Sequence, residues 1–214
     1  MSSPLLETIY LPTLENYSYA KAKEFSKKLD HELGFKIQQV EQNILKDSPH
    51  IPWAGLEPEV LQTPYPEIRM MLEKLSLQKG QTLIDLGAGY GRVGLVISHF
   101  YPEVNFIGYE ISPDRVSEGC RILKPNERVC LLQEDISRSD FKIPISDVYF
   151  IYDFGDLESI IRVIDQLKEI SKFRKIQVLG RGRRTRDHIE RQEPWLSQII
   201  EPVHCGNFSI YQNR

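Results

Sequence analysis

The stretch from Thr82 to Arg92 reads Thr-Leu-Ile-Asp-Leu-Gly-Ala-Gly-Tyr-Gly-Arg, and it decides how the rest of the chain is interpreted. It begins as a short apolar run of the kind that is buried inside a parallel sheet. Glycines then recur at alternate positions, where they allow backbone angles that other residues resist and let a ligand pack against bare main chain. The first amide groups of a following helix would face that ligand. The stretch therefore predicts a strand, a ligand-binding turn and a helix.

Strand-like and helix-like segments alternate along the rest of the chain. We expect helices over 93–100, 112–123 and 157–171, and strands over 105–109, 129–132, 148–153 and 175–179. Such alternation predicts a doubly wound α/β fold, in which helices cover both faces of a parallel sheet. Two further strand-like runs, 199–204 and 208–211, are so close that only a hairpin connects them. The expected sheet is therefore mostly parallel and seven-stranded, with an antiparallel C-terminal strand.

The N-terminal part of the chain lacks this alternation. Apolar residues within 13–33 and 35–45 follow a helical period, which predicts a helical extension over residues 1–59 that could cover the ligand cleft. One α/β domain should then occupy residues 60–214. Thr63 followed by Pro64 predicts the start of a helix, because threonine caps free amide groups and proline fits the first helical turn.

Composition limits the class of protein. The 214 residues carry a formal net charge of −3, so no global positive field would hold polyanions. The three cysteines lie far apart and form no CxxC pair, which argues against a zinc site and against a disulfide framework. No apolar stretch suits a membrane helix, and residues 1–20 do not resemble a secretion signal. We therefore expect a cytoplasmic protein without a metal site.

An acidic residue follows the next predicted strand. Glu110 lies 25 residues after Asp85, by subtraction of their numbers, and a carboxylate in this position accepts hydrogen bonds from ribose hydroxyls. The residue three beyond Gly89 is Arg92 instead of the glycine of the dinucleotide fingerprint, which argues against a nicotinamide or flavin ligand. The pattern by itself predicts an adenosine ligand and leaves the cofactor open.

These residues resemble the first two motifs of class I S-adenosylmethionine-dependent methyltransferases. The resemblance implies that Gly87, Ala88 and Gly89 cradle the methionine part of the cofactor. It implies that Asp85 orders the turn and approaches the amino group of the cofactor, and that Glu110 holds the ribose.

The same resemblance extends over about residues 63–156 and implies contacts to the adenine. An acidic residue commonly follows the third strand in this family, which makes Asp135 the candidate partner of the adenine amino group. Ile136 is the corresponding contact of the adenine ring, and Ile111 is a further candidate contact of the cofactor. Alternatively, Asp135 has a purely structural role, as a turn former or as a helix cap.

The methyl acceptor is expected beyond the carboxyl ends of the strands, next to the segment that follows the fourth strand. Asp153 could accept a proton or orient the acceptor, while Tyr152 or Phe154 could stack on it or surround a cation. Asp156 is a further candidate contact. Asp153 could equally cap the helix that begins near Leu157.

A weaker resemblance, to the non-SET lysine methyltransferase group, concerns the segment before the first strand. It implies that Thr63 or Tyr65 supplies a hydroxyl to the cofactor; the alternative is that Thr63 only caps a helix and Tyr65 only packs. The two prolines that amino-methylating enzymes of nucleobases carry after Asp153 are missing. A protein lysine or a small molecule is therefore the favoured acceptor.

Arg183 belongs to a basic cluster beyond the fifth strand, together with Arg181, Arg184 and Arg186. Arginine forks bind carboxylate or phosphate, which makes Arg183 a candidate contact of an anionic acceptor or of an RNA segment. A run of charged residues more often forms a solvent-exposed face without a ligand, and Asp187 partly neutralises the charge of this basic cluster.

We therefore expect an enzyme that transfers the methyl group of S-adenosyl-L-methionine and releases S-adenosyl-L-homocysteine. Two alternatives stay open: a nicotinamide-dependent oxidoreductase with the same adenosine site, and a catalytically silent cofactor-binding or interaction module.

Overall fold

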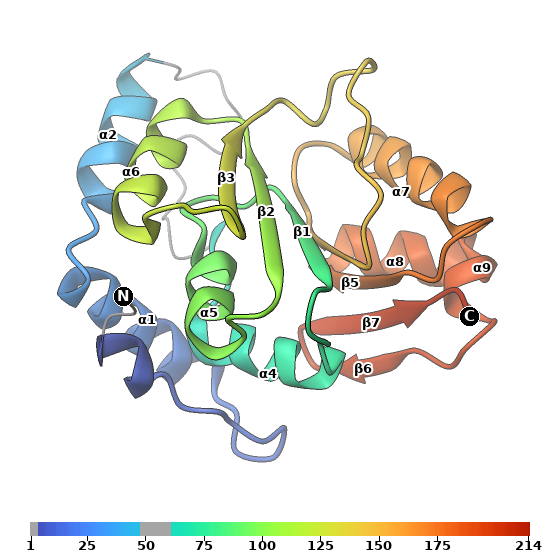
Figure 1. Ribbon diagram of the computed structural model, residues 1–214, viewed down its shortest axis with the longest axis horizontal. Helices are drawn as coiled ribbons and strands as arrows, with labels where there is room; N and C mark the ends of the chain where they lie inside the picture. The colour runs from blue at the N-terminus through green and yellow to red at the C-terminus, as the bar shows by residue number, and fades with distance from the viewer. Residues whose placement is uncertain (1–3, 48–60) are drawn as a thin grey trace.

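The computed structural model describes residues 4–47 and 61–214, and in this part of the chain a sheet of seven strands lies between helices (Figure 1). The strands are β1 (Thr82–Leu86), β2 (Asn105–Glu110), β3 (Val129–Gln133), β4 (Val148–Tyr152), β5 (Gln177–Arg181), β6 (Val203–Cys205) and β7 (Phe208–Gln212). Their order across the sheet is β3-β2-β1-β4-β5-β7-β6.

Strands β1 to β5 are parallel to one another, whereas β7 is antiparallel to both β5 and β6. The prediction of a mostly parallel, seven-stranded sheet with an antiparallel C-terminal strand is thus confirmed. The predicted strand over 175–179 was placed two residues too early. Arg181, expected beyond that strand, is its last residue.

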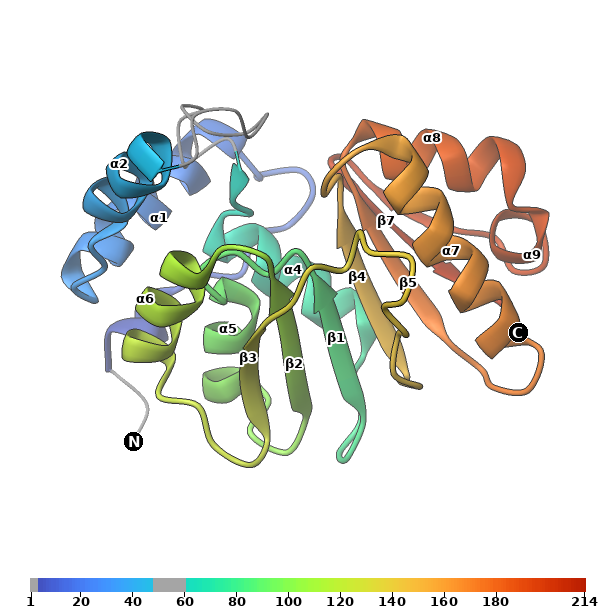
Figure 2. The same ribbon diagram turned by 90° about the horizontal axis from the view of Figure 1, so that it is seen from above.

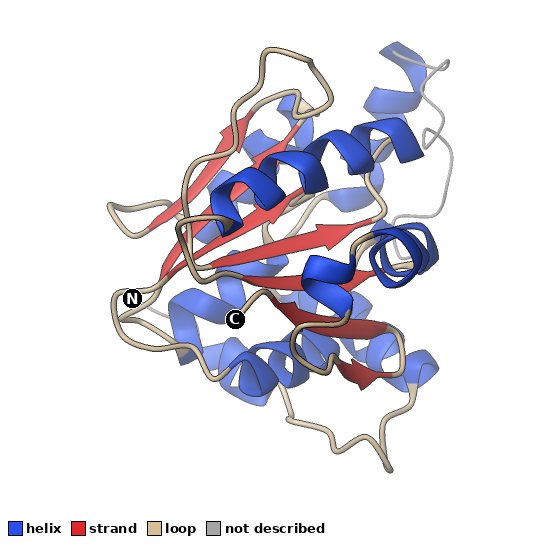
Figure 3. Cartoon of the chain, turned by 90° about the vertical axis from the view of Figure 1, so that its right-hand side faces the viewer, coloured by secondary structure: helices blue, strands red, loops and turns tan. Residues whose placement is uncertain are grey.

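Helices form a layer on each face of the sheet (Figures 2 and 3). They are the 3-10 helix η1 (Pro4–Thr8) and the α-helices α1 (Tyr19–Glu32), α2 (Ile37–Asp47), α4 (Tyr65–Leu75), α5 (Arg92–Phe100), α6 (Pro113–Leu123), α7 (Leu157–Ser171), α8 (Arg183–Gln192) and α9 (Pro194–Ser197). None of the described helices combines the length and apolarity that a membrane crossing requires.

The sheet is buried from both sides because successive residues of its strands point to opposite layers. In β1, Leu83 packs into a core with Ile68 of α4, whereas Ile84 packs into a second core with Ile164 and Leu167 of α7. This two-sided burial explains why the strand reads as a continuous apolar run.

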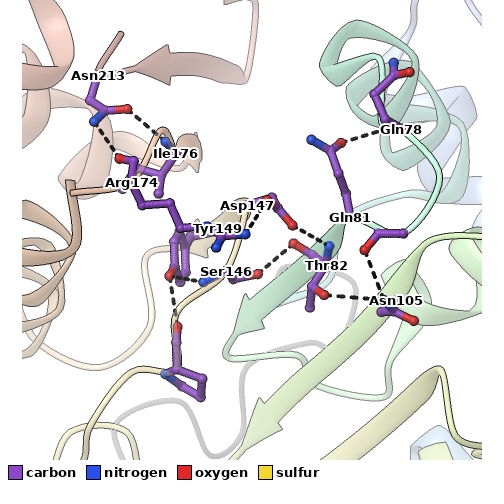
Figure 4. Close-up of polar contacts among 12 residues, drawn as sticks. Gln78, Gln81, Thr82, Asn105, Ser146, Asp147, Tyr149, Arg174, Ile176 and Asn213 are labelled. Atoms are coloured by element: carbon purple, nitrogen blue, oxygen red, sulfur yellow. Dashed lines mark hydrogen bonds and ion pairs between the residues drawn. The ribbon is translucent and has the colours of Figure 1, made fainter. Parts of the chain in front are cut away.

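The amino ends of the strands are held together by a polar network (Figure 4). Asp147 accepts hydrogen bonds from the Thr82 amide at 2.9 Å and from Arg174 Nη2 at 2.7 Å. Ser146 donates to the Thr82 carbonyl at 2.7 Å, and the Tyr149 hydroxyl accepts from the Ser146 amide at 2.7 Å. These contacts join the starts of β1 and β4 to the segment before β5, which is a structural role, so the ligand site is sought at the carboxyl ends.

The predicted helical extension is present, but its first helix is shorter than expected. The helix predicted over 13–33 begins only at Tyr19, because the Thr13 amide donates to Asn16 Oδ1 in a turn and Ser18 is the N-cap. Helix α1 contacts α4, and α2 contacts α6. The predicted boundary between residues 59 and 60 lies outside the described residues.

Candidate functional site

The glycine turn joins β1 to α5 at the carboxyl edge of the sheet. Gly87, Gly89 and Gly91 all have positive φ angles, of +95°, +55° and +75°, which glycine adopts without the cost that other residues pay. The Gly87 and Ala88 amides both donate to the Tyr109 carbonyl, at 2.9 and 2.8 Å. The turn is therefore fixed to the end of the neighbouring strand β2.

The glycines of the turn face different surroundings. A Cβ atom on Gly87 would lie 3.1 Å from the Cβ of Phe154, whereas a Cβ on Gly89 would meet nothing within 4 Å. Gly87 thus allows close packing between the turn and the segment after β4. Gly89 is the position at which bare main chain borders open space.

Glu110 ends β2 beside this open space, and its side chain is 5% exposed. Its Oε2 accepts a hydrogen bond from the Gly89 amide at 2.9 Å, and its Oε1 accepts one from the Ser112 amide at 3.0 Å. An ionised carboxylate has about four acceptor positions, so two amides leave capacity for further donors. Ile111, the next residue, is 47% exposed at the same edge.

Asp85 is the buried acid of the site. Burial, and to a smaller extent the negative charge of Glu110, raise the pKa of Asp85 to about 8. No hydrogen-bond donor to this carboxylate is found among residues 4–47 and 61–214. A cationic group placed beside Asp85 would favour its ionised form and lower that pKa again.

A small hollow of about 30 Å³ lies between the glycine turn and the segment before α4. Its lining includes Gln62, Thr63, Asp85, Gly89, Arg92 and Tyr152. Gln62 Oε1 and Arg92 Nε are buried and have no hydrogen-bond partner in the described part of the chain. Both side chains also line a larger hollow of about 510 Å³ next to α1 and α2, so they form the wall between the two.

From the sequence, Gln62 belongs to the segment that the weaker resemblance places over the methionine part of the cofactor, and Arg92 is expected to be a surface side chain or a brace of the turn. The bracing role is correct and the surface position is wrong, because Arg92 is 6% exposed and its Nη1 donates to the Thr63 carbonyl at 3.2 Å. A signal existed for Arg92: a cation at the first residue of a helix opposes the helix dipole and needs a nearby acid.

The two predicted hydroxyl donors are placed differently from expectation. The N-cap of α4 is Pro64 without a side-chain bond, so Thr63 is not the cap; it lies in the lining of the small hollow. Tyr65 is completely buried, and its hydroxyl donates to Asp30 Oδ1 of α1 at 2.8 Å. That hydroxyl therefore already has a partner outside the pocket.

Asp135 lies shortly after β3, where its side chain stabilises a turn. Its Oδ1 accepts hydrogen bonds from the Ser137 amide at 3.0 Å and from the Ser137 hydroxyl at 2.5 Å. The side chain is half-buried, and Ile136 beside it packs on the core that includes Tyr109. These contacts are local and involve Oδ1 of the Asp135 carboxylate.

Asp153 caps a helix, but not the one that was expected. Its carboxylate accepts from the Arg184 amide at 3.1 Å and from the Thr185 amide and hydroxyl, both at 2.9 Å, at the start of α8. A side chain at Gly182 would overlap this carboxylate. Helix α7 is capped instead by Asp156, which accepts from the Ser159 amide at 2.8 Å. Three donors leave Asp153 with little capacity to act as a base.

The wall of the site beyond β4 and β5 is aromatic and contains one buried ion pair. The Arg181 guanidinium lies 4.1 Å from the ring centre of Tyr152, and its Nε donates to the completely buried Glu67 at 2.8 Å. Burial raises the pKa of Tyr152. Phe154 is half-buried against the turn.

Arg183, the predicted substrate contact, lies on the first turn of α8 and is not part of this wall. Its side chain is 90% exposed, and its Nε lies 3.4 Å from Asp187 Oδ2. In the described residues, no group of histidine, cysteine and acidic side chains is placed to hold a metal ion.

Solved structures similar to this chain include an RNA methyltransferase. An RNA methyltransferase from Salinibacter ruber in complex with S-adenosyl-L-homocysteine has a TM-score of 0.51 at 20% identity, over 71% of this chain and 91% of that one. The pyocyanin biosynthetic protein PhzM has a TM-score of 0.54 at 15% identity, over 80% of this chain and 60% of that one. TrmN from Thermus thermophilus has a TM-score of 0.50 at 15% identity, over 77% and 52%.

The chain thus shares its fold with these proteins and spans little more than half the length of two of them. No protein-family model matches the sequence, and no curated protein matches it significantly. Because these identities are low, the likeness concerns the fold alone.

Proposed function

We propose that this chain is a methyltransferase that binds S-adenosyl-L-methionine across the carboxyl ends of β1 and β2. The observation that carries the proposal is a set of three buried polar groups around one hollow: Asp85, Gln62 and Arg92. Buried polar groups are normally paired, and unpaired ones in a pocket mark a place where a ligand supplies the partner.

The needs of these three groups match the amino-acid end of the cofactor. Asp85 lacks a cation, and Gln62 Oε1 lacks a donor; an ammonium group supplies both. Arg92 Nε lacks an acceptor, which a carboxylate supplies. An α-amino acid carries this combination of groups, whereas a ligand without an ammonium would leave the Asp85 carboxylate without a cationic partner.

The adenosine end has candidate partners along the same edge. Glu110 would accept the ribose hydroxyls with the acceptor positions that Gly89 and Ser112 leave open. Ile111 offers an exposed apolar face to the adenine ring, with Ile136 on the following segment. Asp135 would accept from the adenine amino group.

The small hollow must enlarge before it can hold an amino acid, because 30 Å³ is about the space of one water molecule. Gln62 and Arg92 separate it from the neighbouring hollow of about 510 Å³. Movement of the Gln62 side chain would join the two. We therefore expect the segment around Gln62 to rearrange when the cofactor binds.

Methyl transfer itself asks little of the chain beyond positioning. The bound sulfonium supplies an activated methyl group, so the protein has to align the acceptor and exclude water. Tyr152 and Phe154 would flank the acceptor. Asp153, already satisfied by three donors, would hold the start of α8 in place instead of removing a proton.

A protein lysine or a small molecule remains the favoured acceptor. Arg181, the buried cation of the acceptor wall, is already paired with Glu67, so this wall offers little to a phosphate group. RNA is the alternative: Arg183 is exposed at the rim, and the similar structure from Salinibacter ruber is an RNA methyltransferase.

Titration calorimetry with S-adenosylhomocysteine tests the cofactor. We expect the wild-type chain to bind it, and Glu110→Ala and Gly89→Val to lose binding. Gly206→Val is the matched control, because Gly206 has a φ of +60° and also nothing within 4 Å, but lies in the β6–β7 hairpin. Equal affinity in Gly89→Val and Gly206→Val would refute the placement of the ligand.

Incubation of the wild-type chain with cell extract and methyl-labelled S-adenosylmethionine tests the reaction. Label in the protein or small-molecule fraction would support the favoured acceptors, and label in RNA would support the alternative. Cofactor binding without label in any fraction would favour a catalytically silent module.

A further inference from the structure

Helix α1 contacts the glycine turn through a buried carboxylate. Asp30 forms an ion pair with Arg92 Nη2, and its other oxygen accepts from the Tyr65 hydroxyl at 2.8 Å. Arg92 is the first residue of α5 and also donates to the Thr63 carbonyl. Asp30 therefore fixes the guanidinium whose Nε has no partner.

Helix α2 makes a second contact of the same kind. Glu41 accepts from Arg115 Nε and Nη2, both at 2.9 Å, and from the Tyr90 hydroxyl at 2.8 Å. Arg115 Nη1 lies 3.9 Å from Glu110 Oε1. Glu41 thus holds Arg115, which could otherwise move closer to Glu110.

The two contacts hold the turn on either side of Gly91, because Tyr90 and Arg92 are its direct neighbours in the chain. All four charged side chains are 12% exposed or less, so salt screens these pairs only weakly. Removing one partner of such a pair leaves an uncompensated buried charge, which then reorganises its surroundings.

We propose that Asp30 and Glu41 are positioning residues of the cofactor site, each controlling a different end of the ligand. Asp30 acts through Arg92 on the amino-acid end. Glu41 acts through Arg115 and Glu110 on the ribose end. The N-terminal helices are then part of the binding site and not only its cover. The inference rests on the proposed binding of S-adenosylmethionine.

Two ligands that share adenosine separate these roles. S-adenosylhomocysteine carries the amino-acid end, and 5′-methylthioadenosine lacks it. Asp30→Asn should weaken S-adenosylhomocysteine binding about tenfold or more while leaving 5′-methylthioadenosine unchanged, because only the first ligand uses Arg92. Glu41→Gln should weaken both ligands by a similar factor, since Arg115 then pairs with Glu110 and competes with the ribose.

Calorimetry on the full chain measures the affinities, and circular dichroism with thermal melting checks the fold. Glu32→Gln is the matched control, since Glu32 lies on α1 in an exposed pair with Lys28 at 3.8 Å, and both affinities should stay at the wild-type level. Should Asp30→Asn fail to fold, Tyr65→Phe takes its place. It removes the hydroxyl that contacts Asp30 and Arg92 but keeps both charges, and it should show a smaller loss with the same selectivity.

Equal losses for the two ligands in the Asp30 variant, or in Tyr65→Phe where it stands in, would indicate general loosening and overturn the inference. Unchanged affinities in both the Asp30 and Glu41 variants would overturn it as well, while the proposed function would stand. A wild-type chain that binds neither ligand would overturn the proposed function instead.

Discussion

Replacing Asp85 by asparagine should stabilise the ligand-free chain and weaken its binding of S-adenosylhomocysteine. The pKa of Asp85 is raised from 3.8 to about 8, mainly by burial and further by the charge of Glu110. Between these values the unfolded chain has lost the proton while the folded chain keeps it. The stability that this group contributes is therefore complete below pH 3.8 and falls as the pH rises towards 8.

The size of the effect follows from the pKa difference. Each pH unit within this window costs the wild-type chain about 1.4 kcal/mol, which amounts to about 4 kcal/mol at pH 7. An asparagine does not titrate, but burying its amide without partners costs about 1–3 kcal/mol. The expected net gain for Asp85→Asn at pH 7 is therefore about 1–3 kcal/mol.

Urea unfolding of both proteins between about pH 5 and 9 measures this difference. The advantage of the variant should grow by about 1.4 kcal/mol per pH unit up to about pH 8 and then level off. Calorimetry at neutral pH should show the opposite order for S-adenosylhomocysteine, because asparagine offers no charge to an ammonium group. A stability difference that does not change with pH would refute the reasoning, since Asp85 would then titrate alike in both states.

Three further variants separate structural roles from the site. Asp153→Ala should lower the free energy of unfolding by about 1–2 kcal/mol, because α8 loses its cap, with unchanged affinity for S-adenosylhomocysteine in calorimetry. Asp147→Ala should lower it by about 1–3 kcal/mol in urea unfolding, because the Thr82 amide and Arg174 lose an acceptor, again without loss of affinity. Arg183→Ala should alter neither the melting temperature nor the affinity for S-adenosylhomocysteine. Reduced transfer of labelled methyl groups to the cell extract would then identify Arg183 as an acceptor contact.

The strands could be predicted because burial on two faces leaves a plain apolar pattern. Leu83 and Ile84 point into different cores, and both are apolar. The pattern fails where a strand ends in a polar residue that is nevertheless buried. Strand β5 ends at Arg181, which is buried because Glu67, 114 residues away in the sequence, neutralises it.

Contacts between distant segments could not be predicted from the sequence. The hydroxyl of Tyr65 is taken by Asp30, 35 residues earlier, and Arg92 pairs with the same acid across 62 residues. Asp153 stands four residues before α7, yet it caps α8, whose amides lie 31 and 32 residues further on. Periodicity shows which face of an element is buried, but not which charge it meets there.

The arrangement of the unpaired groups also distinguishes between the two cofactor classes that the turn alone leaves open. Single buried nitrogens without hydrogen-bond partners occur elsewhere in the described part of the chain, on Arg174 and His99 for example, whereas Gln62 and Arg92 share one hollow with the buried acid Asp85. A dinucleotide would bring the negative charge of its pyrophosphate to this turn, which would supply no cation to Asp85 and would hold its carboxyl in the protonated form. A methionine moiety brings a cation for Asp85 and an anion for Arg92 at the same time. The charges of the hollow therefore favour the sulfonium cofactor on electrostatic grounds that are independent of the fold.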